Sequence, residues 1–588
     1  MRPAGQPRIR VPRSERRAQG RGRAATLSRM EHVVLYDTTL RDGAQQEGIS
    51  LSVADKLAAL RILDDLGVDV IEGGWPGAIP KDTEFFRAAA RHPLVHARLA
   101  AFGATVRPGA DPAFDPQVAA LRDSGAPIIT LVAKSDPRHV ERALRTTREE
   151  NLRMVTDTVA WLSDPANGGA EVMVDLEHFF DGLAADPDYG IDVMLAAARA
   201  GAGAVIPCDT NGGNLPGAIA RSIARARTAL DEAGFARVTM GIHTHNDTGC
   251  AVANALAAVE AGARHVQGTI NGYGERTGNA NLLTCLANLQ VKMGYEVVPA
   301  GSLAHLGEVS RRMSELTNIV PFPREPYTGA SAFAHKAGLH ASAIRVDPGL
   351  YQHIDPETVG NGMRMLVSEM AGRSSIELKA RELGVDLAGR PGVAQEVARV
   401  VKEREAQGYT YDAADASFEL LLRDQLGLLP RYARVESWKV TSGEQALPRG
   451  GGDAGGADAR AGRGQARTGV LAESEATVKI HTGHRHIRTA EGNGPVNALD
   501  NALRAALARD YPEASATRLT DFRVRILDPQ HAGTDATIRV LISLTDGTRT
   551  WSTVGVGTDV IEASWEALFD GYWWGLAASG VRSLLIEL

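Results

Sequence analysis

The stretch Val238-Thr-Met-Gly-Ile242 runs directly into His243-Thr-His245-Asn-Asp247, so a short apolar segment ends in a pair of histidines. Side chains alternate across a β-strand, so His243 and His245 point to the same side of it. Two imidazoles on one side can share a metal ion, although paired histidines are also common without one. The stretch therefore predicts a buried strand with a candidate metal site at its end.

Seven further apolar runs of strand length occur in residues 31–300, and helical patterns separate them. The eight predicted strands are 32–36, 69–72, 99–102, 128–132, 171–175, 204–207, 238–243 and 265–270. Eight strands alternating with helices are typical of an α/β fold of the (β/α)8 TIM barrel type. The alternative is an open doubly wound sheet, but its GxGxxG fingerprint is absent from the first strand-to-helix turn. Gly272-Tyr-Gly274-Glu-Arg-Thr-Gly278 has a different spacing and follows the eighth strand.

A barrel gathers the C-terminal ends of its strands around one mouth, where polar residues distant in sequence meet. Asp42 follows the first strand and Asn279 follows the eighth, so both are expected near the histidine pair. One carboxylate, two imidazoles and one amide oxygen suit a divalent ion such as Mn²⁺, Mg²⁺, Co²⁺ or Zn²⁺. With four protein ligands, such an ion keeps open coordination positions, which the carboxylate and keto oxygens of an α-keto acid can occupy.

The composition indicates a soluble globular chain. It is 44% hydrophobic with a net charge of −7, which disfavours nucleic acid as a partner, and it has no apolar stretch long enough for a membrane. Cys208, Cys250 and Cys285 are too few and scattered for a disulfide framework, which fits the cytoplasm. Residues 1–30 are rich in arginine and are predicted to be a disordered basic extension, in which Met30 could be the true start.

The chain beyond the barrel contains two further regions. Residues 301–433 are predicted to be helical linker subdomains, with amphipathic spacing in 393–405 and 416–426. Residues 434–588 form the predicted C-terminal α+β domain, with a glycine-rich flexible insert at 443–471. Strand-like 476–480 and 536–542 each lead through a glycine-rich turn to an amphipathic helix, so an internal repeat is expected. The module could bind an amino acid or serve only in dimerisation.

Two long motifs resemble the signatures of the 2-isopropylmalate, homocitrate and citramalate synthase family. They are Leu40-Arg-Asp-Gly-Ala-Gln45, with Lys56 beyond it, and Met240-Gly-Ile-His-Thr-His-Asn-Asp-Thr-Gly249. The segments 72–77, 175–182 and 208–213 resemble the citramalate synthase branch. This resemblance implies a Claisen-type condensation of acetyl-CoA with pyruvate, using a divalent metal. There are two alternatives. In the first, the same condensation uses a larger keto acid such as 2-ketoisovalerate as the acceptor. In the second, the chain is a lyase of the hydroxymethylglutaryl-CoA type.

The resemblance also implies roles for individual residues at the barrel mouth. Arg41 would stabilise the enolate or alkoxide, Thr210 would hold the keto acid's carboxylate and Glu177 would orient the reacting groups. Glu275 would hold the site in place without contacting the metal, and Gln45 would pack beside the turn that carries Asp42. Trp75 would narrow the pocket for the keto acid. Alternatively, Arg41 and Glu275 form an ion pair, and Thr210 caps the helix after the sixth strand. Lys134 and His139 are weaker candidates for contacts to substrate or CoA.

A second candidate segment lies in the linker. His340 and Tyr351 match the family's general acid/base pair, which the resemblance implies is supplied to the neighbouring subunit of a homodimer. Alternatively, His340 only packs a linker helix. The C-terminal domain resembles the family's regulatory domain, with isoleucine as the expected effector of a citramalate synthase.

Overall fold

The computed structural model describes residues 31–390, 392–446, 470–527 and 536–585. It consists of two compact units, whose boundary lies between Pro321 and Phe322. The predicted extension at 1–30 and residues 447–469 of the predicted insert lie outside the described residues.

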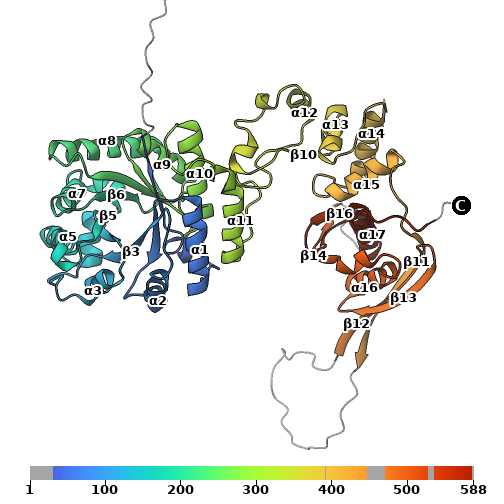
Figure 1. The fold of residues 1–588 in the computed structure, drawn as a ribbon, viewed down its shortest axis with the longest axis horizontal. Coiled ribbons are helices and arrows are strands. Elements are labelled where there is room, and N and C mark those ends of the chain that lie inside the picture. Colours follow the sequence, from blue (N-terminus) through green and yellow to red (C-terminus); the bar gives the residue numbers. More distant parts are fainter. Residues whose placement is uncertain (1–30, 391, 447–469, 528–535, 586–588) are drawn as a thin grey trace, which may run out of the picture. The chain divides into compact units, whose positions relative to one another are not determined.

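The first unit is built on a closed parallel barrel in which the strands follow one another in sequence order (Figure 1). The strands are β1 (Val34–Asp37), β2 (Val70–Gly74), β3 (Arg98–Ala104), β4 (Ile128–Lys134), β5 (Glu171–Glu177), β6 (Ala204–Asp209), β7 (Thr239–Thr244) and β8 (His265–Gly268). The pairing of β1 with β8, from Val34 with His265 to Asp37 with Gly268, closes the barrel. The predicted TIM barrel is confirmed.

Helices surround the strands. They are α1 (Val53–Leu66), α2 (Pro80–Ala89), α3 (Pro116–Asp123), α4 (Pro137–His139), α5 (Arg148–Ser163), α6 (Phe179–Ala185), α7 (Tyr189–Arg199), α8 (Pro216–Glu232), α9 (Ala251–Glu260) and α10 (Leu282–Ala287). Local sequence sets the ends of α1, because Ser52 and Asp55 form a capping box and Gly67 ends the helix at φ 92°.

The barrel unit continues past residue 300, where the sequence placed its end. Helix α11 (Leu306–Thr317) buries Leu306 and Met313. The amide nitrogen of Asn271 donates to the carbonyl of Ser310 at 3.0 Å and so ties the loop after β8 to this helix.

Buried hydrophobic side chains of β1 to β6 pack together in one cluster. They are Tyr36, Val70, Ala100, Ile128, Met173, Ala204, Ile206 and Cys208. Cys208 lies buried in β6, as expected, and the three cysteines are free.

The second unit begins with the helical region that the sequence predicts. It contains β9 (Ala334–His335), α12 (Gly338–Ile344), β10 (Arg364–Met365), α13 (Arg373–Glu382), α14 (Val393–Ala406) and α15 (Asp415–Gln425). The amphipathic segments 393–405 and 416–426 are therefore helices, each within one residue of its predicted bounds.

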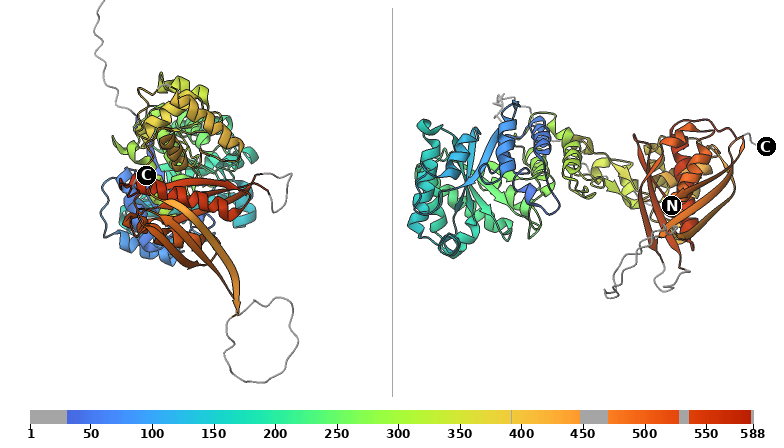
Figure 2. Two further views of the ribbon diagram at one scale, coloured as in Figure 1. Left: turned by 90° about the vertical axis from the view of Figure 1, so that its right-hand side faces the viewer. Right: turned by 90° about the horizontal axis from the view of Figure 1, so that it is seen from below.

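The C-terminal domain contains two copies of one motif, three antiparallel strands followed by a helix. The first copy is β11 (Arg434–Ala446), β12 (Val470–His481), β13 (Arg485–Gly492) and α16 (Pro495–Leu507). The second is β14 (Arg518–Ile526), β15 (Ile538–Thr545), β16 (Thr550–Gly557) and α17 (Val560–Ala578). The strands curve around the helices (Figure 2), and both copies share one core. The predicted repeat is confirmed, although β11 and β12 extend a few residues into the predicted insert.

No helix in the described ranges combines the length and apolar character needed to cross a membrane.

Candidate metal centre and active site

The tight turn after β1 places Asp42 and Arg41 at the mouth of the barrel. The carbonyl of Thr38 accepts hydrogen bonds from the backbone N–H groups of Arg41, Asp42 and Gly43, at 3.1, 2.9 and 3.0 Å. Asp42 is buried, with 4% of its surface exposed. The turn thus holds a carboxylate in a position shielded from water.

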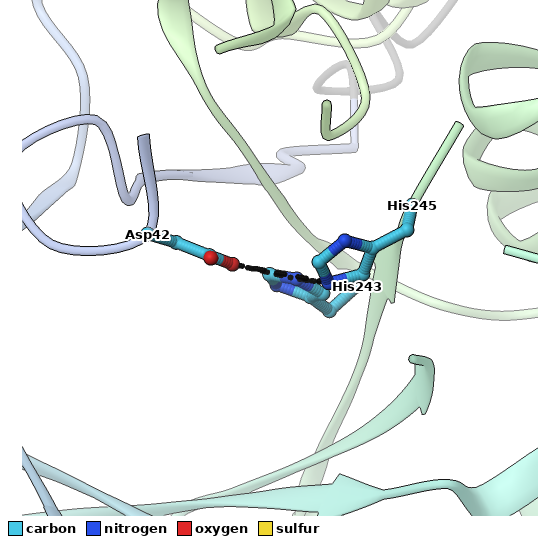
Figure 3. Close-up of side chains that lie close together, drawn as sticks. All are labelled: Asp42, His243 and His245. Carbon is cyan, nitrogen blue, oxygen red and sulfur yellow. Dashed lines mark hydrogen bonds and ion pairs between the residues drawn. The ribbon is translucent and has the colours of Figure 1, made fainter. Parts of the chain in front are cut away.

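Asp42 meets the two histidines of β7 (Figure 3). The Nε2 atoms of His243 and His245 lie 3.2 Å apart, and the Oδ2 atom of Asp42 lies 3.3 Å from the first and 3.9 Å from the second. These three buried side chains can each offer one ligand atom within 4.8 Å of the others. The histidine pair therefore faces one point, as the strand alternation predicts.

The loop after β8 brings Asn279 to the same strand end. His245 and Asn279 form an isolated antiparallel bridge, and the Asn279 amide nitrogen donates to the carbonyl of Tyr273 at 3.1 Å. Its Oδ1 atom is buried and has no hydrogen-bond partner among the described residues. Burying an amide oxygen without a hydrogen-bond partner costs free energy, and this oxygen would gain a partner if it bound a metal ion.

Glycines make this loop possible. Gly278 has φ 89°, and a Cβ atom there would lie 1.9 Å from the carbonyl oxygen of Gly272. The sequence Gly272 to Gly278 is thus no phosphate-binding fingerprint. Its glycines allow the close backbone approach that turns Asn279 inward.

Two buried residues that the sequence analysis missed support His243 from behind. The Gln267 amide oxygen lies 2.8 Å from His243 Nδ1, and the Gln267 amide nitrogen donates to Asp175 at 2.9 Å. An acceptor at Nδ1 fixes the proton there and leaves Nε2 free to bind a metal. The only sequence signal for Gln267 and Asp175 is that each is a polar residue within an otherwise apolar strand.

Electrostatics at this point favour a cation. Burial raises the pKa of Asp42, but Arg41 and His243 outweigh burial and hold that pKa well below its usual value. Burial lowers the pKa of His243, but the contact with Asp42 outweighs burial and raises it. Burial and the neighbouring His243 lower the pKa of His245 to about 3. The ligand set thus attracts a proton between Asp42 and His243, and a divalent ion would compete for that position. These residues fit a divalent metal.

Arg41 is held by partners that the sequence analysis did not identify. Its Nε atom donates to Glu72 at 2.5 Å, and Glu72 in turn accepts from the hydroxyl of Tyr36 at 2.7 Å. The guanidinium also lies 3.8 Å from the centre of the Phe102 ring. Its terminal nitrogens make no hydrogen bond within the part of the chain that the structure describes. Arg41 therefore pairs with Glu72 rather than with Glu275, and it keeps donors available beside Asp42.

Trp75 lies next to this group. Its ring meets Phe102 edge to face, with centroids 5.3 Å apart, and its indole nitrogen is buried with no partner among the described residues. Trp75 and Arg41 thus contact the same phenyl ring.

The ends of β4, β5 and β6 form a second polar group. Lys134 pairs with Glu177, and the ring of His139 stacks on His178 with centroids 3.8 Å apart. Thr210 accepts a hydrogen bond from the backbone N–H of His178 at 2.8 Å. Helix α8 begins only at Pro216 with Leu215 as its N-cap, so Thr210 does not cap it.

Two of the predicted site residues are exposed to solvent. Gln45 is an exposed residue of the first turn. Glu275 is exposed in the loop after β8, where its backbone carbonyl accepts from Gly278 at 2.9 Å.

His340 and Tyr351 meet in the second unit. Their rings stack with centroids 4.1 Å apart and an interplanar angle of 29°. His340 is half-buried in α12, and Tyr351 is 40% exposed.

The closed (β/α)8 barrel, with a carboxylate and two imidazoles together at its strand ends, defines a barrel enzyme with a candidate metal site. Comparisons with known families agree with this class. Residues 32–311 match the HMGL-like family, residues 327–408 match the homocitrate synthase post-HMGL domain-like family, and residues 412–573 match the LeuA allosteric (dimerisation) domain.

Curated relatives identify the family more closely. The chain is 56% identical to an (R)-citramalate synthase of Streptomyces coelicolor, over 93% of this chain and 97% of the relative. It is 45% identical to one of Synechocystis sp., over 92% and 96%. A probable 2-isopropylmalate synthase of Methanopyrus kandleri is more distant, with 32% identity over 92% and 98%. The chain therefore belongs to the (R)-citramalate synthase family.

Proposed function

We propose that this chain condenses acetyl-CoA with pyruvate and hydrolyses the product thioester, giving (R)-citramalate and CoA for isoleucine biosynthesis. The observation that carries the proposal is the buried Asp42, His243 and His245 cluster in a chain that is 56% identical to an (R)-citramalate synthase. The reaction removes one proton from the acetyl methyl group, forms a bond to the ketone carbon of pyruvate and protonates the former ketone oxygen. Water then cleaves the thioester and releases CoA.

Asp42, His243, His245 and Asn279 would hold the divalent ion, with Mn²⁺, Mg²⁺, Co²⁺ and Zn²⁺ as candidates. When bound, such an ion polarises the ketone of the keto acid and offsets the charge that develops on its oxygen. The unpartnered amide oxygen of Asn279 and the neutral imidazole of His245 support this ligand set.

Arg41 stabilises the negative charge that forms on the reacting oxygen. Glu72 and Phe102 fix the guanidinium, so its donors are already aligned before the substrate arrives. Preorganised donors of this kind lower the barrier because no reorganisation is needed as charge develops.

Thr210 and Glu177 position the substrates on the opposite side of the mouth. The Thr210 hydroxyl already accepts from the His178 backbone, so its own O–H can donate to the keto acid's carboxylate. Glu177, paired with Lys134, orients the reacting groups. Gln45 and Glu275 contribute from the outer rim, and Lys134 and His139 contact substrate or CoA.

His340 and Tyr351 form the general acid/base pair, and they act on the active site of the neighbouring subunit. Their stacked rings support a joint role. The cytoplasmic homodimer is then the catalytic unit, and isoleucine acts as feedback effector at the C-terminal domain, which matches the LeuA allosteric (dimerisation) domain.

Acceptor choice distinguishes this proposal from its main alternative, a 2-isopropylmalate synthase that uses 2-ketoisovalerate. The test follows CoA release from acetyl-CoA with a thiol reagent, with Mn²⁺ and either pyruvate or 2-ketoisovalerate. Faster turnover with pyruvate is expected. A preference for 2-ketoisovalerate would refute citramalate synthesis.

A further inference from the structure

A buried ion pair lies beside the end of β2, outside the proposed metal centre. Lys56 of α1 pairs with Asp82 in the first turn of α2, and each residue has only 2% of its surface exposed. Burial lowers the pKa of Lys56, and Asp82 offsets only part of that effect. Removing two charges from water costs free energy, so such a pair is a poor source of stability. Its hydrogen bonds show which part of the chain it fixes instead.

Both members of the pair bind the backbone of the turn that leads into Trp75. The Nζ atom of Lys56 donates to the carbonyl of Gly73 at 3.0 Å, and Asp82 accepts from the backbone N–H of Trp75 at 2.9 Å. The cation thus meets a carbonyl oxygen and the anion meets an N–H group. The pair satisfies one backbone acceptor and one backbone donor at the buried end of β2.

Two glycines allow α2 to approach this turn closely. A Cβ atom at Gly74, which has φ 139°, would collide with the Asp82 carboxylate. A Cβ atom at Gly73 would collide with the ring of Phe85. Close packing against α2 therefore leaves the backbone before Trp75 little freedom to move.

The end of β2 also carries a contact of the proposed active site. Glu72, directly before the two glycines, accepts a hydrogen bond from Arg41. The ring of Trp75 packs edge to face on Phe102, and the Arg41 guanidinium lies 3.8 Å from the centre of the same phenyl ring. A shift of the backbone at Trp75 would therefore move the indole relative to Arg41, while Glu72 could keep its own hydrogen bond.

We infer that the ion pair of Lys56 and Asp82 positions Trp75 and thereby sets the choice between pyruvate and larger keto acids. Both members act through the backbone of the turn, and Trp75 is the residue expected to narrow the keto-acid pocket. The effect on selectivity rests on the proposed function, whereas the fixed position of the indole does not.

The test replaces the pair without leaving an unpaired buried charge. Lys56→Met combined with Asp82→Leu removes both charges and both backbone contacts. Lys56→Met combined with Asp82→Asn removes the charges but keeps an acceptor for the Trp75 N–H. Asp64→Leu is the matched control, because Asp64 lies on the same helix α1 and accepts from the backbone N–H groups of residues 95–97, each at 2.8 Å. That turn precedes β3, at the end of the barrel opposite the mouth.

Three measurements are made on each full-length variant. The ratio of kcat/KM with 2-ketoisovalerate to kcat/KM with pyruvate gives the selectivity. Fluorine NMR of protein labelled with fluorotryptophan reports on the indole, and Trp75→Phe assigns the Trp75 signal. Calorimetric titration of metal-stripped protein with Mn²⁺ shows whether the metal centre is intact.

Lys56→Met/Asp82→Leu should shift the ratio toward 2-ketoisovalerate by about tenfold or more, the effect expected when a pocket admits added methyl groups. Its Trp75 signal should shift or broaden, and its Mn²⁺ affinity should match that of the wild type. Lys56→Met/Asp82→Asn should show smaller changes in the same direction, and Asp64→Leu should show none.

An unchanged ratio in folded Lys56→Met/Asp82→Leu protein would overturn the inference, as would a parallel loss of Mn²⁺ affinity or an equal shift of the ratio in Asp64→Leu. If only the Lys56→Met/Asp82→Asn protein folds, an unchanged ratio and an unchanged Trp75 signal there would overturn it equally. A wild type that does not turn over pyruvate would refute the proposed function instead, and the Trp75 signal would still decide whether the pair fixes the indole.

Discussion

Gln267→Leu should weaken metal binding without touching any of the proposed ligands. Gln267 is fully buried, its amide oxygen lies 2.8 Å from His243 Nδ1, and its amide nitrogen donates to Asp175 at 2.9 Å. Leucine has a similar volume but no acceptor, so His243 would lose the contact that fixes its proton on Nδ1. Loss of such a supporting contact typically reduces metal affinity about 10- to 100-fold.

The same substitution also affects folding, because Asp175 would lose its hydrogen bond. A buried acceptor without a partner costs about 1–3 kcal/mol, so the free energy of unfolding of the metal-free protein should fall by that amount. The two effects can be measured separately. Urea unfolding gives the change in the free energy of unfolding, and calorimetric titration of folded, metal-stripped protein with Mn²⁺ gives the change in metal affinity.

Gln290→Leu provides the matched control. Gln290 also lies in the barrel unit and accepts from the Val298 backbone at 3.2 Å, away from the metal centre. The Gln290→Leu substitution should therefore leave the Mn²⁺ affinity unchanged. If folded Gln267→Leu protein bound Mn²⁺ as tightly as the wild type, the argument that Gln267 orients His243 would be refuted.

Three further predictions concern the keto-acid pocket beside Trp75, the loop that carries Asn279 and the C-terminal domain. Trp75→Ala should raise the rate with 2-ketoisovalerate relative to pyruvate about tenfold, because each methylene accommodated contributes about 1–3 kcal/mol; an unchanged ratio of kcat/KM values would exclude Trp75 from the pocket. Gly278→Ala should lower both thermal stability and metal affinity, since its Cβ would lie 1.9 Å from the Gly272 carbonyl oxygen; normal Mn²⁺ titration would contradict this. Burial raises the pKa of Asp570 from 3.8 to about 7, so the folded state holds a proton that the unfolded chain releases, and stability should fall as pH rises through that interval. The fall in the free energy of unfolding between pH 5 and pH 8, measured by urea unfolding, should be smaller for Asp570→Asn than for the wild type. An equal fall in the two proteins would contradict a raised pKa of Asp570.

The barrel could be predicted from sequence because each strand is a buried apolar run between turn residues. The run 238–243 became β7 at Thr239–Thr244, shifted by a single residue. The predicted strand 265–270 ends earlier, at Gly268, because the backbone of Thr269 pairs with the loop at Ala280 and Leu282 instead. Such tertiary pairing has no signal in local sequence.

The clustering of the candidate metal ligands could be predicted for a different reason. Asp42, His243 and His245 are polar residues at points where apolar runs end, and the barrel topology brings those points together. Glu72, Asp175 and Gln267 were missed because they lie inside strands that are buried on both faces. In such strands the apolar pattern is nearly continuous, so it does not reveal which side chain points into the barrel.

The most direct test is the rate of CoA release from acetyl-CoA and pyruvate as Mn²⁺ is added back to metal-stripped protein, for the wild type and His243→Ala in parallel. The wild type should be inactive when stripped and recover with saturable Mn²⁺ dependence, and His243→Ala should stay inactive at every concentration that saturates the wild type. Turnover by the stripped wild type, or by folded His243→Ala protein, would contradict a catalytic metal held by Asp42, His243 and His245.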